Sequence, residues 1–303
     1  MIVSHRQQRR QVLSYIGLAC PCWRFDEGEA LFMDSSRSLV DQVSLKRYCR
    51  KVSWVVGLIG LWYAHAIEIS GEWLTVAIDF KGVHFPKAVI LHAVFFYVRY
   101  AVSYRDLEEI MAERGVSVDH ATLDRWVVKL SPLIAANAQA RKRPIAVSWR
   151  MDETYIKVKG KWTYLYRAVD HEGKTLDFML SERPDTAAAR RFLKRAIGTN
   201  GTPDRVVIDK SGANLAGLQS VNVILKFTGT GRIIKILQVK YLNNILEQDH
   251  RFIKRITGPM LGFKAFHSAA ATIAGIETAH MIRKGQFDAN GLTAFQQFAA
   301  LAV

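Results

Sequence analysis

Cysteine is nearly absent from this chain. Its three copies, Cys20, Cys22 and Cys49, lie in the first 50 of 303 residues. A disulfide framework is therefore excluded for the main body, and a reducing, cytoplasmic location is expected. The Cys-Pro-Cys step has the wrong spacing for a zinc knuckle, and no fourth ligand is obvious nearby.

Proline is scarce too, with 7 residues, and 50% of the chain is hydrophobic. This composition excludes collagen, coiled coils and a wholly disordered chain.

Long hydrophobic runs are also lacking. The one candidate for a membrane span is the uncharged segment 53–67, which ends at Glu68. A spanning helix needs about 20 apolar residues, and the segment begins too deep in the chain for a secretory signal. We therefore expect a buried helix, or a stretch with no native role, and no membrane partner.

Acidic residues are outnumbered by basic ones. The chain holds 42 Lys and Arg against 27 Asp and Glu, a net charge of +15. Residues 1–77 contribute 9 basic and 7 acidic side chains, so nearly all of the excess belongs to 78–303. A protein this basic binds polyanions, of which nucleic acid is the commonest.

Clear periodic elements begin near Phe80, where three helices are predicted. The spacing of apolar residues predicts the first helix over 87–101. Ser103 and Asp106 predict a second helix with a capping box, which stops at Gly115. Asp119 begins a third helix that is predicted to end before Pro132. A helix, a short turn with glycine and a second helix are typical of a helix-turn-helix. The candidate DNA-reading side chains are His120, Thr122, Asp124 and Arg125, with Lys129 nearer the backbone. A plain three-helix bundle without DNA contact is the alternative.

A different architecture follows the basic segment 141–144. We predict strands over 145–157, 162–169 and 175–181, a helix from Asp185, a strand over 205–209, a helix over 213–227, a strand over 233–239 and a long helix from Asn243 or Asn244. The order predicts an α/β fold in which a three-strand meander and alternating units form a mixed sheet with helices on both faces. The predicted divisions are an irregular extension over 1–79, a helical domain over 80–140, a linker over 141–144, the α/β domain over 145–287 and a tail over 288–303.

Three acidic residues occupy positions that this architecture could bring together. Asp152 lies in the first strand, Asp209 ends the fourth, and Glu247 lies on the last helix. If strands one and four are neighbours, both aspartates enter one crevice, where oxygen ligands suit Mg²⁺ or Mn²⁺. Two such ions, roughly 3.5–4 Å apart, would support phosphoryl displacement. Each acid could instead be a surface residue, a cap or half of an ion pair. Strand alternation sends Glu153 to the other face, but periodicity does not choose between it and Asp152.

The predicted last helix also carries two basic residues in register with its glutamate. Arg251 and Lys254 follow Glu247 by four and seven positions, which places all three on one face. There they would meet DNA phosphates. A simple Glu–Arg surface pair is the alternative.

Three long motifs resemble the IS6 family of bacterial insertion-sequence transposases. They are "SYRDLEEIMAERGVSVDHATLDRW", "WRMDETYIKVKGKWTYLYRAVD" and "KYLNNILEQDHRFIKR…PMLGFKAF". The resemblance runs from about Phe80 to about Lys284. It implies a ribonuclease-H-like catalytic domain whose DDE triad is Asp152, Asp209 and Glu247, with Lys254 as the basic residue of the pattern. It thereby favours Asp152 over Glu153.

The resemblance also implies an activity. Such a protein binds the terminal inverted repeats of its element, cuts 3′ ends with the help of Mg²⁺ or Mn²⁺, transfers the strands to target DNA and yields cointegrates. Two ends are held at once, so at least a dimer on DNA is expected, and no small-molecule substrate. A ribonuclease-H-like integrase or nuclease, and a helix-turn-helix regulator without catalysis, are the alternatives.

The sequence departs from the family pattern at its start. Family members usually begin close to Phe80, whereas about 77 residues precede it here. This segment is interpreted either as an upstream reading-frame extension with no evolved purpose or as an additional segment that binds DNA or a partner.

Overall fold

The chain forms two compact units, Met1–Trp73 and Leu74–Val303. The computed structural model describes residues 23–26, 29–32, 77–80, 84–228 and 233–302. In the first unit, β1 (Trp23–Asp26) pairs antiparallel with β2 (Glu29–Phe32). The predictions about the three cysteines and about segment 53–67 lie outside the described residues. Among the described helices, none has the length and apolarity that a membrane crossing requires.

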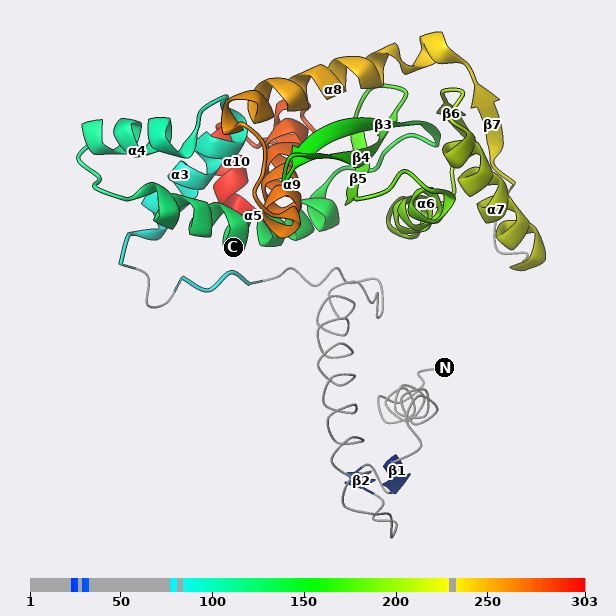
Figure 1. Cartoon of the computed structure of the whole chain (residues 1–303), viewed down its shortest axis with the longest axis horizontal. Coiled ribbons are helices and arrows are strands. Elements are labelled where there is room, and N and C mark those ends of the chain that lie inside the picture. The colour runs from blue at the N-terminus through cyan, green and yellow to red at the C-terminus, as the bar shows by residue number, and fades with distance from the viewer. Residues whose placement is uncertain (1–22, 27–28, 33–76, 81–83, 229–232, 303) are drawn as a thin grey trace. The chain divides into compact units, whose positions relative to one another are not determined.

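A five-stranded mixed sheet is the centre of the second unit (Figure 1). Its strands are β3 (Ser148–Val158), β4 (Lys161–Asp170), β5 (Thr175–Ser181), β6 (Arg205–Ile208) and β7 (Lys235–Gln238). The spatial order is β5-β4-β3-β6-β7. The first three strands form an antiparallel meander, while β6 runs parallel to both β3 and β7. This is the sheet of a ribonuclease-H-like fold, and the predicted meander followed by alternating units is confirmed.

Helices cover both faces of this sheet. They are α6 (Thr186–Asn200) and α7 (Gly212–Thr228) on one face, and α8 (Asn244–Thr257) and α9 (Phe266–Arg283) on the other, with short 3₁₀ turns η1 (Lys240–Asn243) and η2 (Gly258–Met260) flanking α8. In Figure 1, α8 passes along one side of the sheet and α6 lies on the opposite side. Alternation along β3 explains the two layers, because Met151 packs with the α6 and α7 core while Ile156 packs with the α8 and α9 core.

Local sequence signals set several boundaries as predicted. Asp185 caps α6 by accepting a hydrogen bond from the backbone N–H of Ala188 (2.7 Å). The β3–β4 hairpin turns at Lys159 and Gly160, whose φ angles are +51° and +75°. Positive φ at both positions is the signature of a two-residue turn that matches strand twist. Lys161, predicted in the turn, is the first residue of β4.

The three predicted N-terminal helices are α3 (Lys87–Arg99), α4 (Tyr104–Glu113) and α5 (His120–Arg141). Ser103 and Asp106 form the expected capping box, and Asp119 caps α5. The prediction that the third helix ends before Pro132 is wrong, because α5 continues to Arg141. Its second half packs so closely on α9 that a Cβ added at Gly275 would lie 2.7 Å from the Ser131 hydroxyl. Tertiary packing therefore outweighs the hydrogen bond that proline removes.

The predicted linker and tail belong to the packed structure. Arg141 ends α5, and the Lys142 ammonium is part-buried, donating to Gln139 Oε1 (2.6 Å) and to the Leu176 carbonyl. The expected tail over 288–303 contains α10 (Ala294–Ala300), with Phe298 fully buried. One core cluster joins side chains of α3, α4 and α5 with those of α8, α9, α10 and the sheet. The helices predicted as a separate domain over 80–140 thus share their core with the α/β part.

Candidate active site

Asp152 and Asp209 lie on neighbouring parallel strands. In the β3–β6 ladder, Arg150 is opposite Val207, so two residues further along each strand bring Asp152 level with Asp209, just beyond the last residue of β6. The Ser211 N–H donates to Asp209 Oδ1 (2.9 Å) and fixes that carboxylate at the start of the β6–α7 connection. The first and fourth strands of this sheet are therefore neighbours, which is the condition under which the two aspartates were expected to meet.

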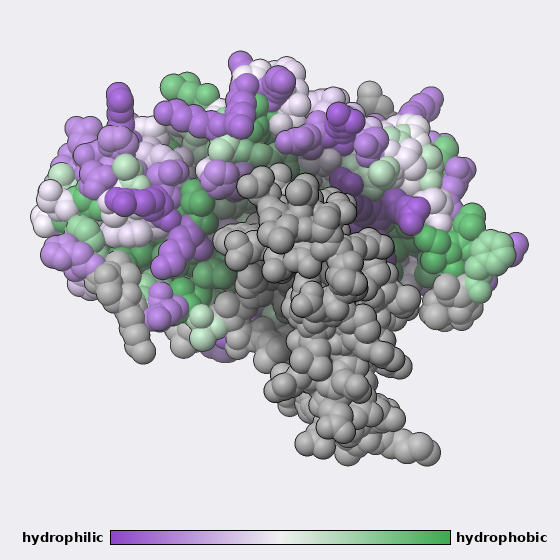
Figure 2. Space-filling model, turned by 60° about the horizontal axis from the view of Figure 1, so that its bottom comes forward, coloured by the Kyte–Doolittle hydropathy of each residue, from purple (hydrophilic) through white to green (hydrophobic). Residues whose placement is uncertain are grey.

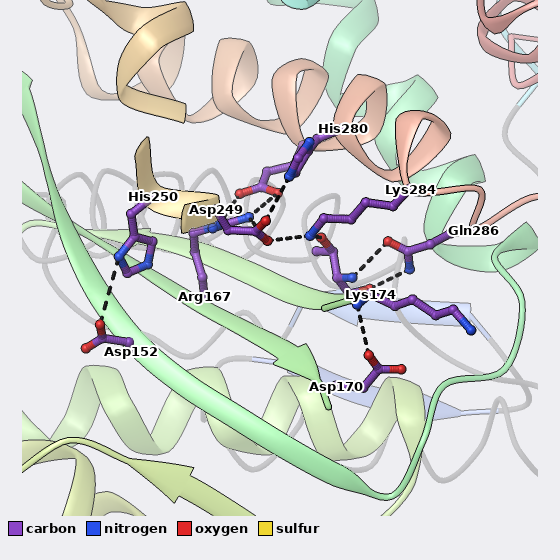
Figure 3. Close-up of polar contacts among 11 residues, drawn as sticks. Asp152, Arg167, Asp170, Lys174, Asp249, His250, His280, Lys284 and Gln286 are labelled. Carbon is purple, nitrogen blue, oxygen red and sulfur yellow. Dashed lines mark hydrogen bonds and ion pairs between the residues drawn. The ribbon is translucent and has the colours of Figure 1, made fainter. Parts of the chain in front are cut away.

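Glu247 reaches the same region from α8. At the start of this helix, Asn243 Nδ2 approaches the Met151 carbonyl (3.5 Å). One turn after Glu247, His250 Nδ1 lies 3.9 Å from Asp152 Oδ2. Figure 3 marks this contact with a dashed line. The helix therefore runs along β3 at Asp152, with the exposed Glu247 between these two contacts.

Negative charge accumulates around Asp152. The pKa of this carboxyl is raised to about 7, first by burial and then by the charges of Asp209, Glu153 and Glu247. Uncompensated carboxylates of this kind are the oxygen donors that a hard divalent cation neutralises. In the part of the chain that the structure describes, no three His, Cys, Asp or Glu side chains are yet arranged to hold an ion. The donor chemistry thus fits a divalent cation, although the ligands do not close around one.

Glu153 belongs to the opposite face of β3. It accepts hydrogen bonds from Asn214 Nδ2 (2.5 Å) and Ser211 Oγ (3.3 Å), and burial raises its pKa. These bonds tie β3 to the start of α7 and to the connection that positions Asp209. The structure thus gives Glu153 a bracing role and leaves Asp152 facing α8.

Sequence reasoning missed His250. Its side chain is 9% exposed, and its pKa falls to about 3 because of burial and of the charges on Arg167 and Lys254. The imidazole is therefore neutral near pH 7, and its approach to Asp152 is not an ion pair. The spacing of three residues from Glu247 is the signal that would have placed it on the same side of the helix.

The predicted phosphate-binding residues of α8 are exposed. Arg251 and Lys254 both face solvent, as does Glu247, consistent with their four- and seven-residue spacing.

The predicted DNA-reading residues of α5 divide into two groups. His120, Arg125 and Lys129 are exposed. Two of them have local partners: His120 Nδ1 lies 3.0 Å from Glu108 Oε2, and Arg125 Nη2 donates to Thr122 Oγ1 (2.6 Å). Asp124 is half-buried, and its charge adds to burial in raising the pKa of Tyr97 and Tyr104. Asp124 therefore lies beside Tyr97 and Tyr104 at the edge of the helical core.

A buried ionic cluster, also missed from the sequence, lies beside the site. Figure 3 labels four of its members, Arg167, Asp249, His280 and Lys284. The fifth is Glu277, which pairs with Arg167. Arg167 is opposite Asp152 in the β3–β4 ladder and is fully buried. It donates to Glu277 Oε1 (2.5 Å) and Oε2 (3.0 Å) and to Asp249 Oδ2 (3.2 Å).

Asp249 joins the other cluster members. His280 Nε2 lies 3.1 Å from Asp249 Oδ1, and the Lys284 ammonium donates to Oδ2. Although burial opposes ionisation, the His280 hydrogen bond and the charges of Arg167 and Lys284 lower the pKa of Asp249. The cluster therefore attaches α8 and α9 to β4 next to Asp152.

Comparisons with known proteins identify a family model and relatives that this chain resembles. A family model described as a DDE domain, DDE_Tnp_IS240, matches residues 146–286. The chain is 40% identical over 206 residues to the transposase for insertion sequence-like element IS431mec of Staphylococcus aureus, covering 68% of this chain and 88% of that protein. The S. aureus transposase for insertion sequence element IS257 in transposon Tn4003 matches at the same identity and coverage.

Among solved structures, part of the chain is similar to two integrase catalytic core domains. That of HTLV-2 integrase in complex with magnesium is 18% identical, with a TM-score of 0.34, over 45% of this chain and 86% of that one. That of BIV integrase is 16% identical, with a TM-score of 0.35, over 51% of this chain and 95% of that one.

Proposed function

This chain belongs to the IS6 family of bacterial insertion-sequence transposases, and we propose that it binds the inverted repeats of its own element, cuts a strand at each 3′ end and joins the freed 3′-OH to target DNA. The family membership makes it a DDE transposase, a polynucleotidyl transferase. The observation that carries the proposal is the convergence of Asp209 and Glu247 on the half-buried Asp152. Cointegrates are the proposed product.

The proposed roles follow from position. Asp152, Asp209 and Glu247 would hold two Mg²⁺ or Mn²⁺ ions. Three carboxylates at one site provide the negative charge for such a pair of cations. When bound, such ions activate the attacking oxygen and neutralise the leaving one. The exposed Arg251 and Lys254 would grip the DNA backbone beside the scissile phosphate, which orients it toward the carboxylates.

We propose that α4 and α5 recognise the inverted repeats. The capped start of α5 presents His120, Arg125 and Lys129 to solvent. In a helix-turn-helix the second helix enters the major groove through such N-terminal residues. Because two ends must be joined in one reaction, we propose that at least two copies of the chain assemble on DNA.

The direct test uses the full-length protein with Mg²⁺ and a duplex that carries the repeat end. We expect a nick at the 3′ end of the repeat and, with target DNA added, joined products. A matched duplex of random sequence is the control. Equal cutting of both duplexes would favour a nuclease of the same fold, and binding to the repeat without any cutting would favour a regulator.

Replacing Arg125 by Ala is expected to weaken repeat binding about tenfold or more, since a base-contacting arginine contributes about 1–3 kcal/mol. Removal of Arg105, an exposed arginine on α4, is the matched control and should weaken repeat and random DNA alike. Gel-shift titrations at one salt concentration provide the measurement. Equal losses on both DNAs for Arg125→Ala would contradict a reading role.

A further inference from the structure

The β3–β4 hairpin exposes an aromatic surface outside the site described above. Trp162 is 63% exposed and Tyr155 is 49% exposed, although both belong to strands of the central sheet. Their ring centroids are 6.4 Å apart, and Tyr164 lies 5.2 Å from Tyr155, with edge-to-face geometry in both pairs. We call Tyr155, Trp162 and Tyr164 the hairpin aromatics.

Core packing does not account for the exposure of these rings. Tyr166, which follows Tyr164 by two residues on the same face of β4, is fully buried against Phe192 of α6. Tyr164 is only partly buried at the edge of that core, and Trp162 and Tyr155 lie outside it. The core beneath α6 therefore does not include Trp162 and Tyr155, whose rings remain open to solvent.

Lysines accompany the aromatic rings. Lys157 is opposite Trp162 in the ladder, and Lys159 and Lys161 flank the turn, all three being exposed. The sequence holds no acidic residue between Thr154 and Val169. In the turn after β5, the exposed Glu182 is followed directly by Arg183, so the local charge remains positive.

The hairpin is held rigidly in place. The Lys159 N–H donates to the Phe263 carbonyl (2.7 Å), and the Phe263 N–H donates to the Lys157 carbonyl (3.1 Å). These bonds join the tip to the segment between α8 and α9. The aromatic rings and lysines are therefore presented on a supported edge, which reduces the ordering cost of binding.

We propose that the hairpin aromatics bind unpaired DNA bases while Lys157, Lys159 and Lys161 hold the adjacent phosphates. Exposed rings interleaved with cations are the arrangement that binds single-stranded nucleic acid, because every base offers a stacking face. Tyr155 follows Asp152 by three residues, roughly 10 Å along the strand, and alternation puts it on the other face of the sheet. The proposed occupant is the unpaired DNA strand that leads from the cut site, on one face of the sheet, to the hairpin aromatics on the other. This inference rests on the proposed function.

The test measures binding of the full-length protein to a repeat-end duplex with a single-stranded tail that contains 2-aminopurine. Stacking of the probe on a ring should quench its fluorescence. Trp162→Ala should abolish the quenching and weaken binding of the tailed duplex about tenfold, while binding of the blunt duplex stays unchanged. Trp162→Phe, which keeps a stacking face, should retain most of the quenching.

The matched control is Phe227→Ala. Figure 2 shows apolar surface at the end of the second unit where α7 lies. Phe227 belongs to the last turn of α7, not to the hairpin, and is 85% exposed. This variant should bind tailed and blunt duplexes like the wild type. Replacing Lys157, Lys159 and Lys161 by Gln should reduce the salt dependence of tail binding, by about 0.7 units of slope for each phosphate of the single strand that is no longer neutralised.

The outcomes separate this inference from the proposed function. If the wild type cuts repeat ends but Trp162→Ala binds the tailed duplex equally well, the hairpin proposal is overturned and the transposase proposal stands. If quenching of an unpaired tail on random duplex depends on Trp162 while repeat ends are never cut, the hairpin proposal stands alone. Loss of self-association in Trp162→Ala, without change in tail binding, would make the surface a protein interface and overturn the proposal.

Discussion

Asp152→Asn is expected to reduce strand cleavage by at least a thousandfold, with repeat binding close to that of the wild type. The carboxylate lies where the charges of Asp209 and Glu247 converge, and an amide of the same shape lacks the charge that a divalent cation requires. Binding depends instead on phosphate contacts by basic residues, which this change leaves in place. Paired gel-shift and cleavage assays on one preparation give the measurement.

Stability provides an internal check on that experiment. In the absence of divalent cations, Asp152→Asn replaces a half-buried carboxylate, one of several clustered acidic groups, by a neutral amide. We therefore expect its melting temperature to equal or exceed that of the wild type.

Asp209→Asn and Glu247→Gln should abolish cleavage in the same way. Cleavage by any of the three would exclude that residue from the triad, and a lowered melting temperature would mean that the carboxylate supports the fold instead.

Arg167→Leu is expected to destabilise the protein by about 3–5 kcal/mol, because it leaves Glu277 and Asp249 without their shared buried cation. Glu277→Leu should cost a similar amount, since it leaves Arg167 underpaired. The double variant should recover much of this stability, as apolar side chains of similar size often replace a buried ion pair at little cost. Urea unfolding of the four proteins measures the coupling.

The exposed pair of Arg143 and Asp288 is the matched control. Their side chains are 2.6 Å apart but 51% and 72% exposed. Arg143→Leu should change the free energy of unfolding by less than about 1 kcal/mol. Additive destabilisation in the Arg167 and Glu277 double variant would show that the two residues act independently and would contradict the cluster.

Position of the cluster makes it relevant to activity as well. Asp249 lies two residues after Glu247 on α8, and Arg167 is opposite Asp152 on β4. The ion pairs between them thus fix the helix that carries one acid relative to the strand that carries another. A variant that weakens the cluster without unfolding the protein should therefore lose cleavage before it loses DNA binding.

Local signals in the sequence determined the beginnings of three helices, α4, α5 and α6. Ser103, Asp119 and Asp185 each cap a helix through a backbone N–H three residues away, so the information lies within one turn. Alternation along β3 likewise separated Asp152 from Glu153. What periodicity left open was which of them serves the site, and the family motifs supplied that choice.

Only the tertiary structure decided the features that depend on distant contacts. The helix α5 passes Pro132 because α9, more than a hundred residues later, packs on it at Gly275. Arg167 and Glu277 are 110 residues apart, and neither has a neighbour in sequence that indicates a buried partner. His250 approaches Asp152 only because α8 is laid along β3. Caps and alternation act over a few residues, whereas burial and ion pairing arise only when the whole core assembles.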